Sequence, residues 1–157
     1  MKVGLVSSKG GHLGQIKIIF TKEVIGKNEA VLITESEKKI IKEEKSFLGR
    51  FRTYYFKKDN LSFNPIKYLI ATINLIRLYR KEDISLIVTN GAQISIPALI
   101  GARLIGIKSI FIDTIIRVKT PNWSARFCYY FSDVFIVQHK SMMGKYGKKA
   151  IYRGGVL

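Results

Sequence analysis

The fold class that this sequence predicts is α/β, with a Rossmann-like parallel sheet flanked by helices. Short runs rich in Val and Ile alternate with longer segments of helical pattern along the chain. Several runs are apolar at consecutive positions, as in strands that helices cover on both faces. Such alternation is typical of βαβ units in a parallel sheet. The 157 residues, 47% of them hydrophobic, suit a single domain that spans residues 1–157.

The apolar runs define the predicted strands. Five of them are apolar at consecutive positions, around Leu5, Leu32, Leu86, Phe111 and Phe135. In chain order, the predicted strands are Lys2–Ser7, Ala30–Thr34, Phe51–Phe56, Ser85–Thr89, Ser109–Asp113, Val134–Gln138 and, with the weakest pattern, Ala150–Tyr152.

Helices are predicted in the gaps between these strands. The first, His12–Gly26, carries apolar residues on one side, and the second, Ser36–Lys45, is short and charged. Asn64 can cap the third, Pro65–Lys81, whose proline suits a first turn. The remaining two predicted helices also begin near prolines and are Pro97–Ile105 and Thr120–Phe131.

The charge balance indicates an anionic partner. Lys and Arg number 27 against 11 Asp and Glu, which gives a net charge of +16. Such a surface attracts phosphates, nucleic acids or anionic membranes. The sequence has no helix-turn-helix signature, zinc-ligand set or RNP-like strand, so nucleic acid is not the partner that we expect.

Cysteine content and hydropathy suggest a cytoplasmic location. Cys128 is the only cysteine, which excludes an intrachain disulfide and suits a reducing compartment. The apolar run Val3–Val6 is too short for a secretory signal, and no stretch has the ~18 uninterrupted apolar residues of a spanning helix. We therefore expect a soluble or peripheral protein.

The turn between the first strand and the first helix, Ser7–His12, is rich in small residues. Glycines let a backbone turn sharply and approach a ligand, and a helix N-terminus attracts phosphate. The turn matches neither Gly-x-Gly-x-x-Gly nor a P-loop, which disfavours a dinucleotide or nucleoside triphosphate. The candidate phosphate-binding residues are Ser8, Lys9, Gly10 and Gly11. The alternative is a tight turn that binds nothing.

His12 is the candidate catalytic residue. It lies in the first helical turn after a parallel strand, where α/β folds bind ligands. A helix dipole there lowers the pKa of an imidazole and leaves it neutral, as a general base for a hydroxyl requires. The alternative is a surface histidine at the helix start. His139, the other histidine, also follows a strand and is interpreted as a loop residue.

Two further loops follow predicted strands and should lie at the same edge of the sheet. They add Asn90, Gly91, Asp113 and Arg117 as candidate phosphate-binding residues. Arg117 suits a phosphate because its guanidinium can form paired hydrogen bonds. Acidic residues near the strand ends are too few for a Mg²⁺ site, so we predict neither a metal nor a cofactor.

Several short motifs together resemble the Alg-fourteen/PssD family of oligosaccharide-biosynthesis proteins. The resemblance begins at Ser-Ser-Lys-Gly-Gly-His-Leu, residues 7–13, and continues along almost the whole chain. The order and spacing of the motifs carry it, and the later ones are Asn64–Lys67, Ile87–Ala92, Ile110–Asp113 with Arg117-Val118, Phe135–Gln138 and Gly154–Val156.

The resemblance implies one half of an enzyme. Family members form the amino-terminal half of a GT-B glycosyltransferase split over two chains, and a small partner supplies the carboxyl-terminal half with most of the nucleotide-sugar site. The present half would recruit that partner to the cytoplasmic face of a membrane and help to bind a lipid-linked acceptor. Gly10, Gly11 and His12 would then face the diphosphate and hydroxyl of the acceptor. The chain would be inactive without its partner.

The sequence departs from the family pattern in three places. Lys9 replaces a small residue, Asp113-Thr114 replaces Glu-Ser, and the spanning helix that begins the eukaryotic form is absent. Any membrane contact should therefore be peripheral, on the inner face of the cell membrane.

Two segments favour such contact independently of the resemblance. The helix around Ile66–Tyr79 has a narrow polar stripe, and its surplus apolar surface suits lipid, a partner or a deep place in the core. Residues 114–157 are basic and aromatic, and Trp123, Arg126 and Tyr130 are the candidate membrane or partner contacts. The alternative for this segment is a solvated basic face over core aromatics.

Three functions stay open at this stage. The first is a glycosyltransferase subunit that helps to pass a sugar from a nucleotide diphosphate, UDP-linked by the resemblance, to a lipid-linked acceptor. The second is a non-catalytic membrane-docking module whose partner performs all the chemistry. The third, suggested by the net charge alone, is a nucleic-acid-binding protein.

Overall fold

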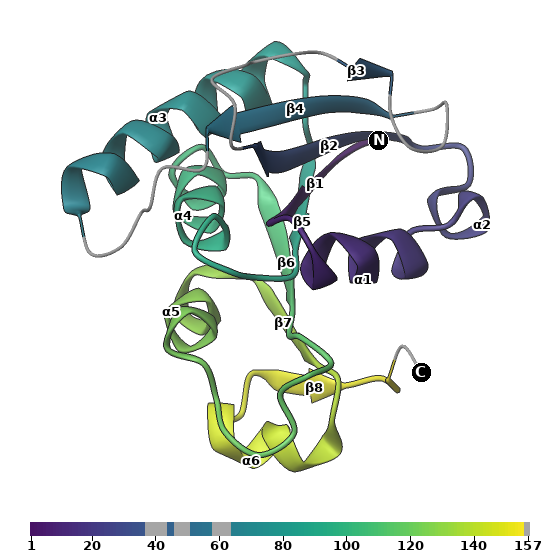
Figure 1. Ribbon diagram of the computed structural model, residues 1–157, viewed down its shortest axis with the longest axis vertical. Helices are drawn as coiled ribbons and strands as arrows, with labels where there is room; N and C mark the ends of the chain where they lie inside the picture. Colours follow the sequence, from purple (N-terminus) through teal and green to yellow (C-terminus); the bar gives the residue numbers. More distant parts are fainter. Residues whose placement is uncertain (37–43, 46–50, 58–63, 156–157) are drawn as a thin grey trace.

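The architecture is an α/β sheet with helices on both faces (Figure 1), and the computed structural model describes residues 1–36, 44–45, 51–57 and 64–155. Within these residues, eight strands form one sheet in the order β3-β4-β2-β1-β5-β6-β7-β8. Only β3 (Glu44–Lys45) is antiparallel to its neighbour among the described strands. The parallel strands are β1 (Lys2–Ser7), β2 (Glu29–Ser36), β4 (Arg52–Lys57), β5 (Leu86–Thr89), β6 (Lys108–Ile112), β7 (Val134–Val137) and β8 (Ala150–Tyr152). The predicted Rossmann-like sheet is confirmed.

Helices cover the two faces of the sheet unequally. In Figure 1, α1 (Gly11–Ile19) lies on one side, and α3 (Pro65–Lys81), α4 (Ser95–Leu104) and α5 (Trp123–Phe131) lie on the other. The short elements are α2 (Lys22–Ile25), the 3₁₀ turn η1 (Lys140–Met142) and α6 (Met143–Tyr146).

Packing against both faces explains the consecutive apolar residues of the strands. In β1, Leu5 belongs to the cluster beneath α1 and Val6 to the cluster beneath α3 and α4. Both side chains are almost fully buried. Because neighbouring strand residues point to opposite faces, a doubly covered strand needs apolar residues at every position.

The sheet end near α5 has an aromatic core. The rings of Phe111 and Phe135 stack with centroids 4.9 Å apart. Cys128 is fully buried in the same cluster, so this thiol serves packing, and burial raises its pKa.

The predicted helix His12–Gly26 is wrong in its length, because the chain forms α1 and α2 instead. Phe20 leaves the helical region with φ −100° and ψ 67°. The ring of Phe20, which follows the last residue of α1, packs against the cluster beneath α1.

The other predicted helices need smaller corrections. Most of Ser36–Lys45 lies outside the described residues; Ser36 ends β2 and Glu44–Lys45 form β3. Helix α4 begins two residues before Pro97, which is tolerated in a first turn because amide groups there have no intrahelical acceptor.

Side-chain caps define the starts of α3 and α5. Asn64 accepts hydrogen bonds from the amides of Ile66 (3.0 Å) and Lys67 (3.3 Å), as predicted for the start of α3. Asn122 accepts one from the amide of Ser124 at 3.3 Å. Helix α5 therefore begins at Trp123 and not at Thr120.

Candidate functional site

The site lies where the strand order changes direction. From β1, the chain proceeds outward through β2 on one side, and then returns to β5 on the other side. The connections that follow β1 and β5 therefore diverge and leave a crevice at their carboxyl ends. The first turn of α1 carries His12, and the β5–α4 loop carries Asn90 and Gly91.

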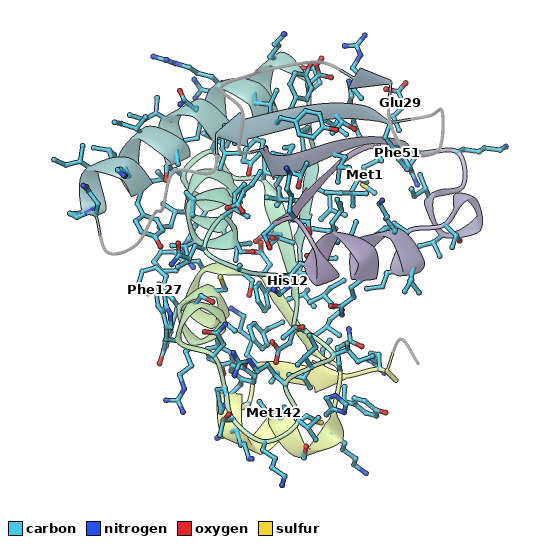
Figure 2. The ribbon with its side chains drawn as sticks, in the orientation of Figure 1. Met1, His12, Glu29, Phe51, Phe127 and Met142 are labelled. Carbon is cyan, nitrogen blue, oxygen red and sulfur yellow. The ribbon has the colours of Figure 1, made fainter. Side chains whose placement is uncertain are left out.

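His12 and Asn90 hold each other through two hydrogen bonds. The imidazole Nδ1 lies 2.9 Å from the backbone oxygen of Asn90. The side-chain amide of Asn90 donates to the backbone oxygen of His12 at 2.5 Å. Figure 2 shows His12 at the start of α1, where this helix approaches the strands. The structure thus brings together two predicted site residues from different loops.

Gly91 makes room for the imidazole. Its φ is +111°, a conformation that residues with a side chain rarely adopt. A Cβ atom at this position would lie 2.9 Å from His12 Cε1. The ring of His12 therefore rests against a backbone that only glycine can provide.

Ser95, at the start of α4, fixes the loop that bears Asn90 and Gly91. Its hydroxyl accepts a hydrogen bond from the Gly91 amide at 3.0 Å and lies 2.6 Å from the Thr89 hydroxyl. Both hydroxyl-bearing residues are fully buried. The serine therefore holds the loop in the conformation that receives His12.

The imidazole of His12 is held neutral and in one tautomer. Burial lowers its pKa, the bond to Asn90 partly offsets this, and the charge of Arg117 lowers it further. The predicted direction is correct, and burial is the largest of these causes. Because a carbonyl only accepts, Nδ1 must carry the proton, which leaves Nε2 as the basic nitrogen.

Asp113 follows β6 at the same edge of the sheet and is almost completely buried. Its Oδ1 accepts a hydrogen bond from the Thr114 amide at 2.9 Å, while its buried Oδ2 has no hydrogen-bond partner among the described residues. The Tyr146 hydroxyl lies near this carboxylate, outside hydrogen-bonding geometry. Burial raises the pKa of Asp113, although Tyr146, Thr114, Arg117 and His139 act in the opposite direction.

Arg117 is exposed, and its charge acts on the groups around it. It lowers the pKa of His12 and favours the ionised form of Asp113. The two residues thus share a cationic neighbour, and an exposed guanidinium at this place can bind a phosphate.

The predicted glycine turn divides into buried and exposed parts. Ser8 is buried, whereas Lys9, Gly10 and Gly11 are exposed. Gly10 turns the chain with φ +82°, and the first turn of α1 has neither a side-chain cap nor an acidic residue. The first amide groups of α1 can therefore meet an anion.

The predicted membrane contacts lie apart from His12, on α5. Trp123, Arg126 and Tyr130 are all exposed there, and Tyr130 retains 71% of its surface. Within the described residues, no helix combines the length and apolar character needed to cross a bilayer. The described part of the chain also has no cluster of three His, Cys, Asp or Glu side chains suited to a metal.

Sequence reasoning missed four residues that organise the site. Besides Ser95 and Tyr146, these are Gln15, whose amide donates to the Asp113 backbone oxygen at 3.2 Å, and His139, whose Nε2 lies 2.6 Å from the Ile115 oxygen. His139 lies in the loop after β7, as interpreted, and in addition its ring contacts the Ile115 backbone. Its place directly after a strand was a usable signal, and the contacts of Ser95 are also local, with Thr89 and Gly91. The contacts of Gln15 and Tyr146, in contrast, depend on Asp113, which is distant in sequence.

Comparison with known proteins assigns the chain to a family. The family described as "Oligosaccharide biosynthesis protein Alg14 like" matches residues 8–156. The chain belongs to this family. The human and rat proteins named UDP-N-acetylglucosamine transferase subunit ALG14 are 32% identical to it over 78 residues, which is 46% of this chain and 36% of theirs. The family member described here thus spans little more than a third of the length of these relatives.

Solved structures share the fold at low sequence identity. Acinetobacter baumannii MurG superposes with a TM-score of 0.75 and 14% identity, covering 99% of this chain and 46% of that one. The S. aureus MnaA–UDP structure gives a TM-score of 0.73 and 10% identity, with 99% and 45% covered. The fold of this family member is therefore that of about half of each of these larger chains.

Proposed function

We propose that residues 1–157 form the acceptor-binding subunit of a two-chain glycosyltransferase in polysaccharide or glycan biosynthesis. The reaction would move a sugar from a nucleotide-diphosphate sugar, UDP-linked as for the human and rat relatives, to a lipid-linked acceptor. The observation that carries the proposal is His12. Its imidazole is neutral, its basic Nε2 makes no hydrogen bond to the described residues, and it lies beside Arg117 and the uncapped start of α1.

In this mechanism, His12 acts as the general base. Its Nε2 accepts the proton of the acceptor hydroxyl, and the oxygen then attacks the anomeric carbon of the donor sugar. The bond between that carbon and the nucleotide diphosphate breaks, and the diphosphate leaves with the electron pair. Asn90 keeps the proton on Nδ1, so that Nε2 stays available.

Arg117 and the glycine turn would hold the acceptor diphosphate. The exposed amides at Gly10 and Gly11 and the guanidinium offer positive charge at the same edge of the sheet. Lys9 would add a second cation. Asn90, Gly91 and Asp113 would position these groups, since they are buried beneath the site.

The rest of the enzyme would be a small partner that supplies the carboxyl-terminal half of a GT-B fold. That partner would bind most of the nucleotide sugar, so we expect this chain alone to be inactive. We further propose a cytoplasmic, peripheral location on the inner face of the cell membrane. Trp123, Arg126 and Tyr130 suit it, because aromatic and basic residues together favour an anionic bilayer surface.

The test begins with capture of the tagged chain from gently solubilised native membranes, followed by mass spectrometry. We expect a stoichiometric small partner, and sugar transfer when both chains are combined with UDP-sugars and a lipid-linked acceptor. His12→Ala should lower turnover by about 10²–10⁴-fold with partner binding unchanged. Turnover by the purified single chain would contradict the need for a partner.

A second candidate is a membrane-docking module whose partner performs all the chemistry. The exposed apolar residues of α3 and the exposed aromatics of α5 favour it. In that case, the His12→Ala complex would keep full activity, whereas Trp123→Ala would release the complex from membranes. Because both candidates place Trp123 at the membrane, the activity of the His12→Ala complex is the measurement that separates them.

A further inference from the structure

An apolar groove lies between α3, α4 and α5, on the opposite side of the sheet from α1. Its volume is about 440 Å³, within the range of about 300–1,000 Å³ typical of ligand pockets. Leu69 of α3, Leu104 of α4 and Phe127 of α5 contribute to its walls. Figure 2 shows Phe127 on the side of α5 that faces away from the sheet.

The floor of the groove offers no hydroxyl to a ligand at Thr72. Thr72 is almost fully buried, and its hydroxyl already donates to the Tyr68 backbone oxygen at 2.8 Å. Ile96 lines the groove nearby and is equally buried. Tyr68 also lines the groove, and its buried hydroxyl has no hydrogen-bond partner among the described residues. The lining is otherwise mainly apolar, so the occupant should be mainly apolar, because most polar groups there would lose their hydrogen bonds to water.

The walls are open to solvent. Leu69 is 60% exposed and Leu104 is 69% exposed, on two different helices. Contiguous exposed apolar surface around a concavity often marks a ligand-binding groove or an interaction site. The groove thus has a buried floor, apolar walls and an open mouth.

The charges on the surrounding helices are of one sign. Helices α3, α4 and α5 contain no Asp or Glu. Their charged residues are Lys67, Arg77, Arg80, Lys81, Arg103 and Arg126. An apolar occupant that carries an anionic group is therefore complementary to this region, whereas an acid-free apolar peptide would gain nothing from it.

The groove is continuous in the chain with the candidate site. Ile96 is the second residue of α4, which follows the Asn90-Gly91 loop, and Trp123 is the first residue of α5, which follows the Arg117 loop. Both helices begin at the carboxyl edge of the sheet, where His12 lies. A ligand with its anionic group at that edge can thus place an attached chain along these helices.

We propose that this groove binds the hydrocarbon chain of the lipid-linked acceptor, with the acceptor diphosphate at the His12 edge. The inference rests on the proposed function and adds to it a specific place for the lipid. Binding in the groove differs from contact with a bilayer surface. A single hydrocarbon chain would enter the groove, and the exposed residues of α3 outside it would not contribute to the affinity.

Farnesyl diphosphate, a soluble isoprenoid diphosphate, serves as the probe. Inorganic diphosphate, which has no hydrocarbon chain, serves for comparison. We expect the full chain to bind farnesyl diphosphate at least about tenfold more tightly than inorganic diphosphate, as calorimetry can measure. Leu69→Asn should remove this difference, and Leu104→Asn, from the opposite wall, should do the same. Both residues are exposed, so both variants should fold, as circular dichroism can verify.

Ile70→Asn is the matched control. Ile70 is the next residue of α3, is 53% exposed and does not line the groove. This variant should bind farnesyl diphosphate as the original chain does. Equal affinity for the two probes, or equal losses in Leu69→Asn and Ile70→Asn, would overturn the inference.

Failure of the inference and failure of the proposed function give different results. Sugar transfer to a lipid-linked acceptor that is insensitive to Leu69→Asn would reject the groove and leave the function standing. Farnesyl diphosphate binding that requires Leu69, without transfer in the assembled complex, would support the groove and reject the function.

Discussion

Two buried carboxylates lie at opposite edges of the sheet and behave in opposite ways. Glu82 lies at the amino edge, between α3 and β5, and Asp113 lies at the carboxyl edge, after β6. Each residue is only 2% exposed. Nevertheless, the pKa of Glu82 is lowered and that of Asp113 is raised.

The surroundings of Glu82 fully satisfy its charge. It accepts hydrogen bonds from Lys2 Nζ at 2.8 Å and from the Tyr54 hydroxyl at 2.5 Å, and Arg52 lies 3.4 Å away. Burial alone would raise its pKa, but these hydrogen bonds and the two positive charges together lower it. This cluster ties the starts of β1 and β4 to the end of α3.

Asp113 has fewer partners for the same burial. One carboxylate oxygen accepts from the Thr114 amide, and the other has no hydrogen bond within the described structure. Asn90, also buried at this edge, likewise has a side-chain oxygen without a partner there. The Glu82 cluster therefore satisfies its own charge, whereas Asp113 and Asn90 at the carboxyl edge retain unused hydrogen-bonding capacity. Such capacity is typical where a fold binds ligands at some loss of stability.

The largest expected effect is on the amino edge. Glu82→Gln removes the charge that pairs with Lys2 and Arg52, and it should lower the free energy of unfolding by about 2–3 kcal/mol. Partial exposure of the two cations keeps the loss below that of a fully buried pair. Urea denaturation followed by circular dichroism measures it.

Asp133→Asn is the control for Glu82→Gln at the same edge. Asp133 pairs with Lys108 at 3.2 Å, but its side chain is 42% exposed. Removal of its charge should therefore lower the free energy of unfolding by only about 1 kcal/mol or less. Equal losses in the two variants would mean that burial does not increase the contribution of Glu82 to the free energy of unfolding.

The second effect concerns the carboxyl edge. Gly91→Ala introduces a Cβ atom 2.9 Å from His12 Cε1 at a φ of +111°, and it should destabilise the fold by about 2 kcal/mol. The displaced imidazole should become more exposed, so its pKa should rise toward the ordinary value. An NMR titration of the His12 ring protons measures this.

Gly106→Ala separates backbone strain from contact with His12. Gly106 also has a positive φ, +73°, but beyond its chain neighbours no atom of the described residues lies within 4 Å of a Cβ placed there. This variant should be destabilised by about 1 kcal/mol and should leave the His12 titration unchanged. A shifted His12 pKa in both variants would show that the titration reports general loosening and not displacement by the Cβ atom.

Local sequence patterns were enough to predict much of the fold. The consecutive apolar residues of β1 predicted cover on both faces, and Asn64 predicted the start of α3. The Gly-Gly-His turn predicted a histidine at the start of a helix. Each of these signals lies within a few residues, so a reader of the sequence can recognise it.

Contacts between distant residues could not be predicted. His12 and Asn90 are 78 positions apart, and no local pattern shows that they bond to each other. Glu82 meets Lys2 and Tyr54 only because the sheet brings the starts of β1 and β4 together. Gly91 was named as a phosphate-binding candidate, but its role in accommodating the His12 ring needs the backbone conformation.

The third effect, smaller still, is on Asp113. Asp113→Asn keeps an oxygen for the Thr114 amide and removes a buried charge with few partners. The free energy of unfolding at neutral pH should therefore change by less than about 1 kcal/mol, and any change should be stabilising. The same urea denaturation measures it, and a loss as large as that of Glu82→Gln would end the distinction between the two edges.

The last expected effect is the dependence of stability on pH, and its sign differs between Glu82 and Asp113. For Glu82, the lowered pKa means a contribution to stability that is present above the ordinary pKa of 4.5 and is lost as the pH falls through the lower folded value. For Asp113, the raised pKa means that ionisation opposes folding. This penalty is absent below the ordinary pKa of 3.8 and is complete above the folded value.

Denaturation from about pH 3 to about pH 7 should therefore show two opposite trends. The free energy of unfolding of Glu82→Gln should approach that of the original chain as the pH falls, because protonation of Glu82 removes from the original chain the charge that the variant lacks. Any advantage of Asp113→Asn should also shrink, and since the two differences have opposite signs, the three stability curves should converge in acid. A deficit of Glu82→Gln that grows in acid would mean that its partners do not favour the ionised form. An advantage of Asp113→Asn that persists at the lowest pH would mean that the missing charge is not its source.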